Sequence, residues 1–122
     1  MADSLTTFEE LKTQVAQFCE QRDWDPFHSA KDLAIGAITE SAELLEHFRF
    51  LDGGQVEALM GHPEKRQAVG EELADVLFFL LRFSQKYELD LSTCFKEKMT
   101  KNGKKYPVEE FRGKNHKSQH KV

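Results

Sequence analysis

Two pairs of acidic residues are unusual because each pair falls within a strongly apolar segment. Two residues separate Glu40 from Glu43, and two separate Glu72 from Asp75. In a helix this i, i+3 spacing places both side chains of a pair on one face, with Cβ atoms about 5–6 Å apart. Like charges at that distance repel each other, and burying a carboxylate is far more costly. The four acids therefore need a partner that neutralises them.

Divalent cations are the partners that this set of side chains favours. Carboxylate oxygens suit Mg²⁺ or Mn²⁺, and magnesium completes its coordination shell with waters and substrate phosphates. A di-iron bundle would require Glu-x-x-His motifs, and the spacing of Glu43 and His47 does not provide one. The competing interpretation is a pair of solvated helix faces, on which acids at this spacing are common. The pattern predicts a metal site with oxygen ligands that serves phosphate chemistry.

The elements that position these acids are predicted to be helices. Apolar residues recur at helical spacing between the three prolines, and no segment alternates convincingly with the period of a strand. Thr7 and Glu10 form a plausible capping box, and Ser29 and Asp90 are candidate N-caps. We expect an all-α domain over residues 1–111. Its four main helices are predicted at residues 8–22, from the Ser29 cap to about 50, 64–87 and 91–104, with a possible short helical turn at 55–60 after Asp52-Gly53-Gly54 ends the second helix.

Two of these helices are too apolar for a small monomer to cover. Residues 33–38 and 73–81 are apolar almost all round, which is typical of helices buried on more than one side. A second subunit would bury them. We therefore expect a homo-oligomer in which subunit association completes the four-helix bundle.

Composition and charge limit the partners and the location of the protein. The chain has 122 residues, 39% of them hydrophobic, and a formal net charge of −4. Residues 112–122 hold four basic side chains and no acid, so the remainder carries 13 Lys and Arg against 21 Asp and Glu, a balance of −8. We expect this basic tail to be disordered. The acidic body disfavours a nucleic-acid polymer as partner. With two cysteines, no membrane-spanning stretch and no secretory signal, a cytoplasmic location is expected.

With these motifs, the sequence resembles the all-α nucleoside triphosphate pyrophosphohydrolases of the MazG type, which carry ExxE and then ExxD on two helices. Three further blocks resemble the dCTP pyrophosphatase subgroup. They are Arg22-Asp-Trp-Asp-Pro-Phe-His28, the Glu-Leu-Ala-Asp-Val segment from Glu72, and Lys98-Met-Thr-Lys-Asn-Gly-Lys-Lys-Tyr-Pro107. The resemblance covers roughly residues 5–110. It implies Mg²⁺-dependent hydrolysis of a deoxynucleoside triphosphate, dCTP or a related one, to monophosphate and pyrophosphate. It also implies a dimer or a dimer-of-dimers tetramer that cleanses the nucleotide pool.

The resemblance also implies roles for individual residues. Glu40, Glu43, Glu72 and Asp75 match the magnesium ligands, and a carboxylate not fully engaged with metal, Glu43 or Glu40, would take the proton of the attacking water. On the fourth helix and just after it, a further set matches positions that bind phosphates of the same or a neighbouring subunit: Lys98, Asn102, Lys105 and Tyr106. Taken alone, that stretch also fits a solvated, lysine-rich helix end.

A base pocket needs flat surfaces, and four side chains are candidates. Trp24 lies on a predicted loop and is suited to stacking, and His28 is suited to a hydrogen bond with the base or a phosphate. Phe50 and Phe79 correspond to positions that flank the base in the subgroup, which often has Trp and Tyr there. Each has an alternative: Trp24 as a plug of the first helix, His28 as a cap, and both phenylalanines as core. Base preference is therefore less constrained than the reaction.

Two other functions are compatible with the sequence. A related all-α enzyme would act on dUTP or on a damaged purine nucleotide. A helical interaction module would use its acidic face to bind a basic partner without turnover.

Overall fold

The computed structural model describes residues 2–122, and these residues form helices and no strand. The all-α prediction is confirmed. Four helices are long, and one shorter α-helix lies between the second and third of them. The elements are 3₁₀ turns at Asp3–Leu5 and Asp25–Phe27 and helices α1 (Phe8–Glu20), α2 (Ala30–Glu46), α3 (Gly53–Gly61), α4 (Pro63–Lys86), α5 (Leu91–Lys105) and α6 (Val108–Phe111).

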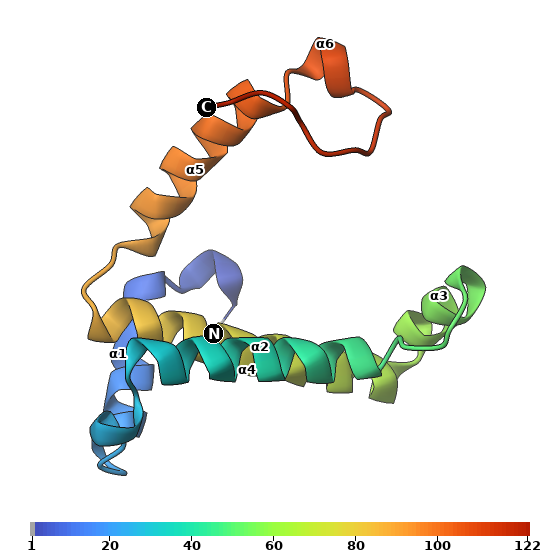
Figure 1. Ribbon diagram of the computed structural model, residues 1–122. Helices are drawn as coiled ribbons and strands as arrows, with labels where there is room; N and C mark the ends of the chain where they lie inside the picture. Colours follow the sequence, from blue (N-terminus) through green and yellow to red (C-terminus); the bar gives the residue numbers. More distant parts are fainter. Residues whose placement is uncertain (1) are drawn as a thin grey trace. The chain divides into compact units, whose positions relative to one another are not determined.

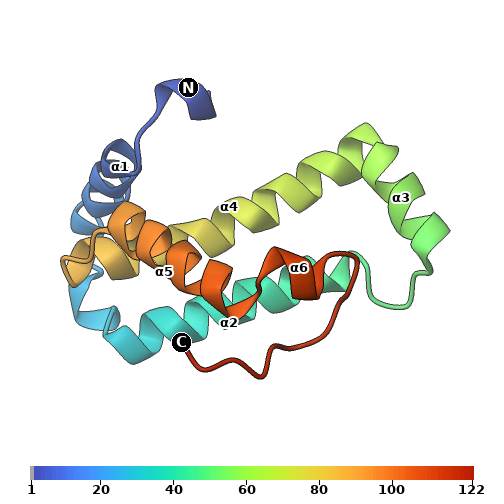
Figure 2. The same cartoon turned by 90° about the horizontal axis from the view of Figure 1, so that it is seen from above.

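The chain divides into two compact units, residues 1–88 and 89–122, and each is described by itself. In the first unit α2 and α4 lie side by side and run in opposite directions (Figures 1 and 2). Helix α1 packs against α4 near one end of this pair, and α3 packs against α4 at the other end. This antiparallel α2–α4 pair is the frame that holds both acid motifs. The expected completion of the bundle by subunit association stays a prediction.

Side-chain caps explain where the helices begin. The Thr7 hydroxyl accepts from the Glu10 backbone N–H at 3.1 Å and starts α1. Ser29 caps α2 as predicted, and Asp32 returns a bond to the Ser29 backbone, which completes a capping box. Asp90 likewise accepts from the backbone N–H of Thr93 and starts α5. Each cap satisfies a backbone donor that the first turn of a helix leaves without a partner.

Helix α2 is shorter than predicted, because it ends at Glu46 rather than near residue 50. Residues 47–50 form turns, and Phe50 has a φ of 72°, in the left-handed region. The expectation that Asp52 helps to end the second helix was also wrong. Asp52 and Gln55 form a capping box that begins α3, so the chain must already be extended at Asp52, where φ is −83° and ψ is 174°. Because Asp52 must be extended to cap α3, the chain leaves the helical conformation of α2 before it reaches Asp52.

The buried apolar core of the first unit is small. It consists of Val15 and Cys19 on α1, Leu33 on α2, and Val69 and Leu81 on α4. Full burial of such a side chain stabilises the fold by about 1.5–3 kcal/mol. The same two central helices leave large apolar side chains in contact with solvent: Ile35, Ile38, Leu73 and Leu80.

The second unit contains α5, α6 and the basic tail. Residues 112–122 form neither helix nor strand. Ser118 is buried and its hydroxyl donates to the Lys105 carbonyl, and a ring nitrogen of His120 lies 2.6 Å from a Glu110 carboxylate oxygen. The tail's disorder and the domain boundary at residue 111 stay predictions. Among residues 2–122, no helix has both the length and the hydropathy that crossing a bilayer demands.

Candidate metal and nucleotide site

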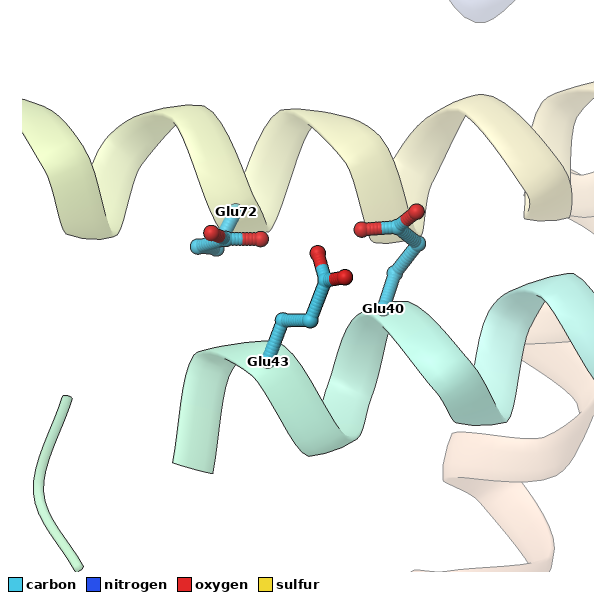
Figure 3. Close-up of side chains that lie close together, drawn as sticks. All are labelled: Glu40, Glu43 and Glu72. Atoms are coloured by element: carbon cyan, nitrogen blue, oxygen red, sulfur yellow. The ribbon is translucent and has the colours of Figure 1, made fainter. Parts of the chain in front are cut away.

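Three of the four predicted metal ligands converge between α2 and α4. Glu40 and Glu43 extend from α2 toward Glu72 on α4 (Figure 3). One carboxylate oxygen from each residue lies within 4.8 Å of one from each of the others. The i, i+3 spacing puts the two α2 acids on one face, and the antiparallel packing of α4 brings the third acid opposite them. We call these three residues the acidic cluster.

Two oxygens of the acidic cluster lack hydrogen-bond partners. Glu40 Oε2 and Glu72 Oε2 are buried, and no donor among the described residues reaches either. A buried polar atom without a partner loses roughly 1–3 kcal/mol of solvation that nothing else returns. A set of metal ligands that consists only of carboxylate oxygens suits Mg²⁺ or Mn²⁺, and two of these oxygens are free to coordinate. The residues present therefore fit a hard divalent cation, and a fully solvated acidic face does not account for the buried oxygens.

The neighbouring acids raise the pKa of Glu40. Its pKa is raised from 4.5 to about 7. The largest cause is a hydrogen bond shared with Glu43, which requires a proton on the pair. Burial and the negative charges of Glu43, Asp75 and Glu72 raise the pKa further. Near neutral pH the metal-free cluster can therefore exchange a proton for a cation.

This shift predicts how stability depends on pH. Because the pKa of Glu40 in the folded protein, about 7, exceeds the ordinary value of 4.5, the native state holds an extra proton between those two values. The stability due to that proton is fully present below 4.5 and is lost as pH rises through about 7. Thermal unfolding without metal, measured from pH 5 to pH 8, should therefore show that wild-type protein loses more stability than Glu40→Gln. Equal loss in both proteins would refute this assignment.

Asp75, the fourth predicted ligand, lies at the edge of this arrangement. It is exposed on α4 and is not one of the three residues of the acidic cluster. Its negative charge nevertheless raises the pKa of Glu40, and the two residues line the same cavity. Its role as a ligand stays a prediction.

His47 is a neighbour of the cluster that sequence reasoning set aside. Its Nε2 lies 3.7 Å from Glu72 Oε1, and the two side chains are 24% and 22% exposed. The spacing between Glu43 and His47 does not complete a metal-ligand motif. The contact of His47 is instead with a carboxylate on another helix, a position from which a histidine can orient a metal ligand.

A cavity of about 490 Å³ adjoins the acidic cluster in the first unit. Its volume falls within the range of small-molecule pockets. Two of the four candidate base-contacting residues, Trp24 and Phe79, line it, and Glu40 and Asp75 give it a carboxylate edge. The sequence does not predict that α1 contributes to the cavity, because the spacing of its apolar residues is that of a helix packed on the core. The lining residues from α1 are Leu11, Gln14, Val15 and Phe18.

His28 lies in a polar network that anchors the Trp24 loop to α4. Its side chain is buried, and its Nδ1 accepts a hydrogen bond from Arg82 Nε at 2.9 Å. Arg82 is 5% exposed and also donates to Asp25 at 3.1 Å and to Gln85 at 2.6 Å. Lys86 Nζ donates to the backbone carbonyls of Asp25 and His28. We call Asp25, His28, Arg82 and Lys86 the loop anchor.

The contacts within the loop anchor account for the lowered pKa of His28 and for its structural role. Burial, followed by the positive charges of Arg82 and Lys86, lowers its pKa. The ring is therefore neutral, in keeping with a nitrogen that accepts from a guanidinium. His28 is not among the residues that line the cavity. Contact of His28 with nucleotide stays a prediction, and the contacts present hold the loop on which Trp24 reaches the cavity.

Phe50 occupies a different environment from Phe79. Its side chain is 89% exposed, in the turn after α2, and the guanidinium carbon of Arg49 lies 4.7 Å from its ring centroid. It does not line the cavity. An aromatic ring so exposed is not core, so the core alternative for Phe50 was wrong. Its place beside a base stays a prediction.

The candidate phosphate-binding residues all belong to the second unit. Lys98, Asn102 and Lys105 are on α5, and Tyr106 directly follows it. Lys105 Nζ lies 5.9 Å from the centroid of the Tyr106 ring. Their approach to a nucleotide stays a prediction.

The fold and site define a class of all-α proteins in which acids on two antiparallel helices face one another beside a cavity. The MazG-like family matches residues 35–120, and the chain belongs to this family. dCTP pyrophosphatase 1 of Rattus norvegicus is 33% identical over 107 residues, which cover 88% of this chain and 63% of that protein. The Homo sapiens protein of the same name is 32% identical over 102 residues, 84% of this chain and 60% of that one. The chain thus spans less than two-thirds of the length of these relatives.

A solved structure supports the same fold. The crystal structure of a pyrophosphatase from Archaeoglobus fulgidus matches with a TM-score of 0.74 and 34% sequence identity. The match covers 88% of this chain and 98% of that one.

Proposed function

We propose that the protein is an enzyme that hydrolyses a deoxynucleoside triphosphate, dCTP or a close relative, to the monophosphate and pyrophosphate. The observation that carries the proposal is the acidic cluster, with two buried oxygens awaiting a cation, beside a cavity lined by Trp24 and Phe79. Relatives named dCTP pyrophosphatase and a pyrophosphatase of the same fold support the reaction.

Mg²⁺ is the proposed cofactor, and Mn²⁺ is a possible substitute. Glu40, Glu43 and Glu72 would hold it, with Asp75 nearby. When bound, it supplies positive charge that neutralises the triphosphate and polarises its phosphoryl oxygens. The four carboxylates are the ligands that the sequence predicts, and the donor set contains only oxygen, in keeping with a hard cation.

The remaining chemistry is assigned to side chains of this chain. Glu43 is exposed, so its carboxylate is accessible to take the proton of an attacking water, and Glu40 is the second candidate. The water oxygen forms a new bond to phosphorus, and the bond that joins the monophosphate to pyrophosphate breaks. Trp24 and Phe79 are proposed to flank the base. The lysines of α5 are proposed to neutralise the leaving pyrophosphate, in this subunit or a neighbouring one.

A profile of pyrophosphate release across the common nucleotides, with and without Mg²⁺, tests this function. We expect release of pyrophosphate rather than phosphate, only with the metal, and greatest for dCTP. Greater release from dUTP or a damaged purine nucleotide would change the substrate but keep the reaction. No release from any nucleotide, together with an unchanged melting temperature on adding Mg²⁺ and nucleotide, would favour an interaction module instead.

We also propose that the chain forms a homo-oligomer, either a dimer or a dimer-of-dimers tetramer. Ile38 is 70% exposed on α2, and Ile35, Leu73 and Leu80 add apolar surface on the two central helices. Large apolar side chains exposed on central helices are suited to burial in an interface between subunits. In a cell, such an enzyme would act on the nucleotide pool of the cytoplasm.

The exposed isoleucine gives a direct test of association. Ile38→Lys places a charge in the proposed interface and should shift the mass measured by light scattering from oligomer to monomer. Gln17→Lys adds the same charge to an exposed position on α1 and should leave the mass unchanged. A wild-type monomer would contradict the proposal.

A further inference from the structure

The ring of Phe79 rests directly on the backbone of α2 at Gly36. A Cβ atom added at Gly36 would lie 2.5 Å from Cδ1 and 2.6 Å from Cζ of Phe79, and closer still to Cε1. Optimal contact between carbon atoms is about 3.5–4.0 Å. The ring therefore occupies the space that any side chain at position 36 would need.

This close approach is specific to Gly36. A Cβ added at Gly70 on α4, or at Gly103 on α5, would meet no other atom within 4 Å. Glycine in a helix interior destabilises it by roughly 0.5–1 kcal/mol relative to alanine. At position 36 that loss is offset by the room it leaves for an aromatic ring on the facing helix.

The position of the Phe79 ring has a consequence for the cavity. One side of the ring contacts α2, and Phe78 packs edge-on against it, with ring centroids 5.3 Å apart. The ring also lines the cavity that Trp24 borders. A ring displaced from α2 therefore moves into the cavity, and the cavity becomes shallower.

We propose that Gly36 is a specificity-determining residue: by letting Phe79 rest on α2, it sets the depth of the base pocket and hence the largest base admitted. The inference rests on the proposed function, because it takes the cavity to be the base pocket. Gly36 is a positioning residue, since it acts through Phe79 and need not touch the nucleotide.

Gly36→Ala should narrow the pocket selectively. One additional or missing methylene in a pocket changes discrimination by roughly 10–200-fold. We expect the ratio of dissociation constants for dGMP and dCMP to rise about tenfold or more in the variant, because the purine is the larger base. A loss of affinity that is equal for both nucleotides would leave the ratio unchanged and would contradict the inference.

The chain's single tryptophan provides a readout that needs no turnover. Trp24 lines the cavity, so a bound base should quench its fluorescence, and dCMP and dGMP titrations measure affinity directly. Wild-type protein that binds dCMP and dGMP but releases no pyrophosphate from any deoxynucleoside triphosphate would refute the proposed reaction and leave the pocket inference standing. Equal dGMP-to-dCMP ratios in wild type and Gly36→Ala would overturn the pocket inference and leave the reaction standing.

Two further variants keep the test decisive. Gly70→Ala adds the same methyl group to a helix where no atom opposes it, and its ratio should equal that of wild type. Phe79→Leu keeps Gly36 and removes the ring, so it should lower the ratio and admit the purine more readily, whether or not Gly36→Ala folds. Phe79→Leu added to Gly36→Ala should restore dGMP binding. Failure of both leucine variants to improve dGMP binding would contradict the inference.

Discussion

Replacing Glu43 with glutamine should reduce pyrophosphate release by about 100-fold or more while the protein stays folded. Glutamine keeps the shape of the side chain but loses the charge that binds a cation and the ability to take a proton. The two effects act together in the acidic cluster, where an oxygen of Glu43 lies within 4.8 Å of oxygens of Glu40 and Glu72. Removing one of three like charges should also raise the melting temperature of the metal-free protein and diminish its rise with Mg²⁺.

The matched control is Glu46→Gln on the same helix. Glu46 is exposed and pairs with Arg49 at 3.2 Å, a surface contact of small energetic value. Its activity and its response to Mg²⁺ should equal those of wild type. If Glu43→Gln kept more than about a tenth of the wild-type activity, the assignment of Glu43 as both ligand and proton acceptor would be wrong.

The second large effect is expected at Arg82. Arg82→Met keeps most of the volume of the buried side chain but leaves the buried Nδ1 of His28 without its donor. An unsatisfied buried group costs about 1–3 kcal/mol, so the free energy of unfolding should fall by that amount. With the loop anchor broken, Trp24 is held less firmly at the cavity. The KM for nucleotide should rise more than kcat falls, and urea unfolding with steady-state kinetics measures both.

Two substitutions show whether the loop anchor, rather than any loss of charge, is responsible. Arg66 lies on the same helix and is exposed, so Arg66→Met should change stability by less than about 0.5 kcal/mol. Asp25 is 76% exposed, so Asp25→Asn should cost much less than Arg82→Met. An Arg82→Met protein as stable as wild type, with an unchanged KM, would show that the anchor does not position the loop.

The sequence alone predicts the parts of the fold that depend on local spacing. The i, i+3 acids, the caps Ser29 and Asp90, and the helical periods all follow from rules that act within a few residues. The end of α2 is less accessible, because it depends on competition between two helices for the chain near Asp52. The interpretation of Asp52 as the end of one helix failed because the same residue types cap the next.

Contacts between distant helices explain what sequence reasoning missed in the site. His28 and Arg82 are 54 residues apart, and nothing in their local sequence indicates a hydrogen bond. Phe18 on α1 has the spacing of a core residue, yet it lines the cavity. The pairing of Gly36 with Phe79 likewise depends on the register of α2 against α4. Such features need the packed structure, because periodicity identifies a face of a helix but not its neighbour.

We propose that the carboxylates between α2 and α4 hold divalent cations for a polyphosphate. The most direct measurement is a crystal structure with Mn²⁺ and a non-hydrolysable dCTP analogue, in which anomalous scattering locates the metal. We expect anomalous density for a metal coordinated by oxygens of Glu40, Glu43 and Glu72 and by the analogue's phosphates, with the base between Trp24 and Phe79. Carboxylates turned apart toward solvent, with manganese bound elsewhere or nowhere, would contradict this proposal.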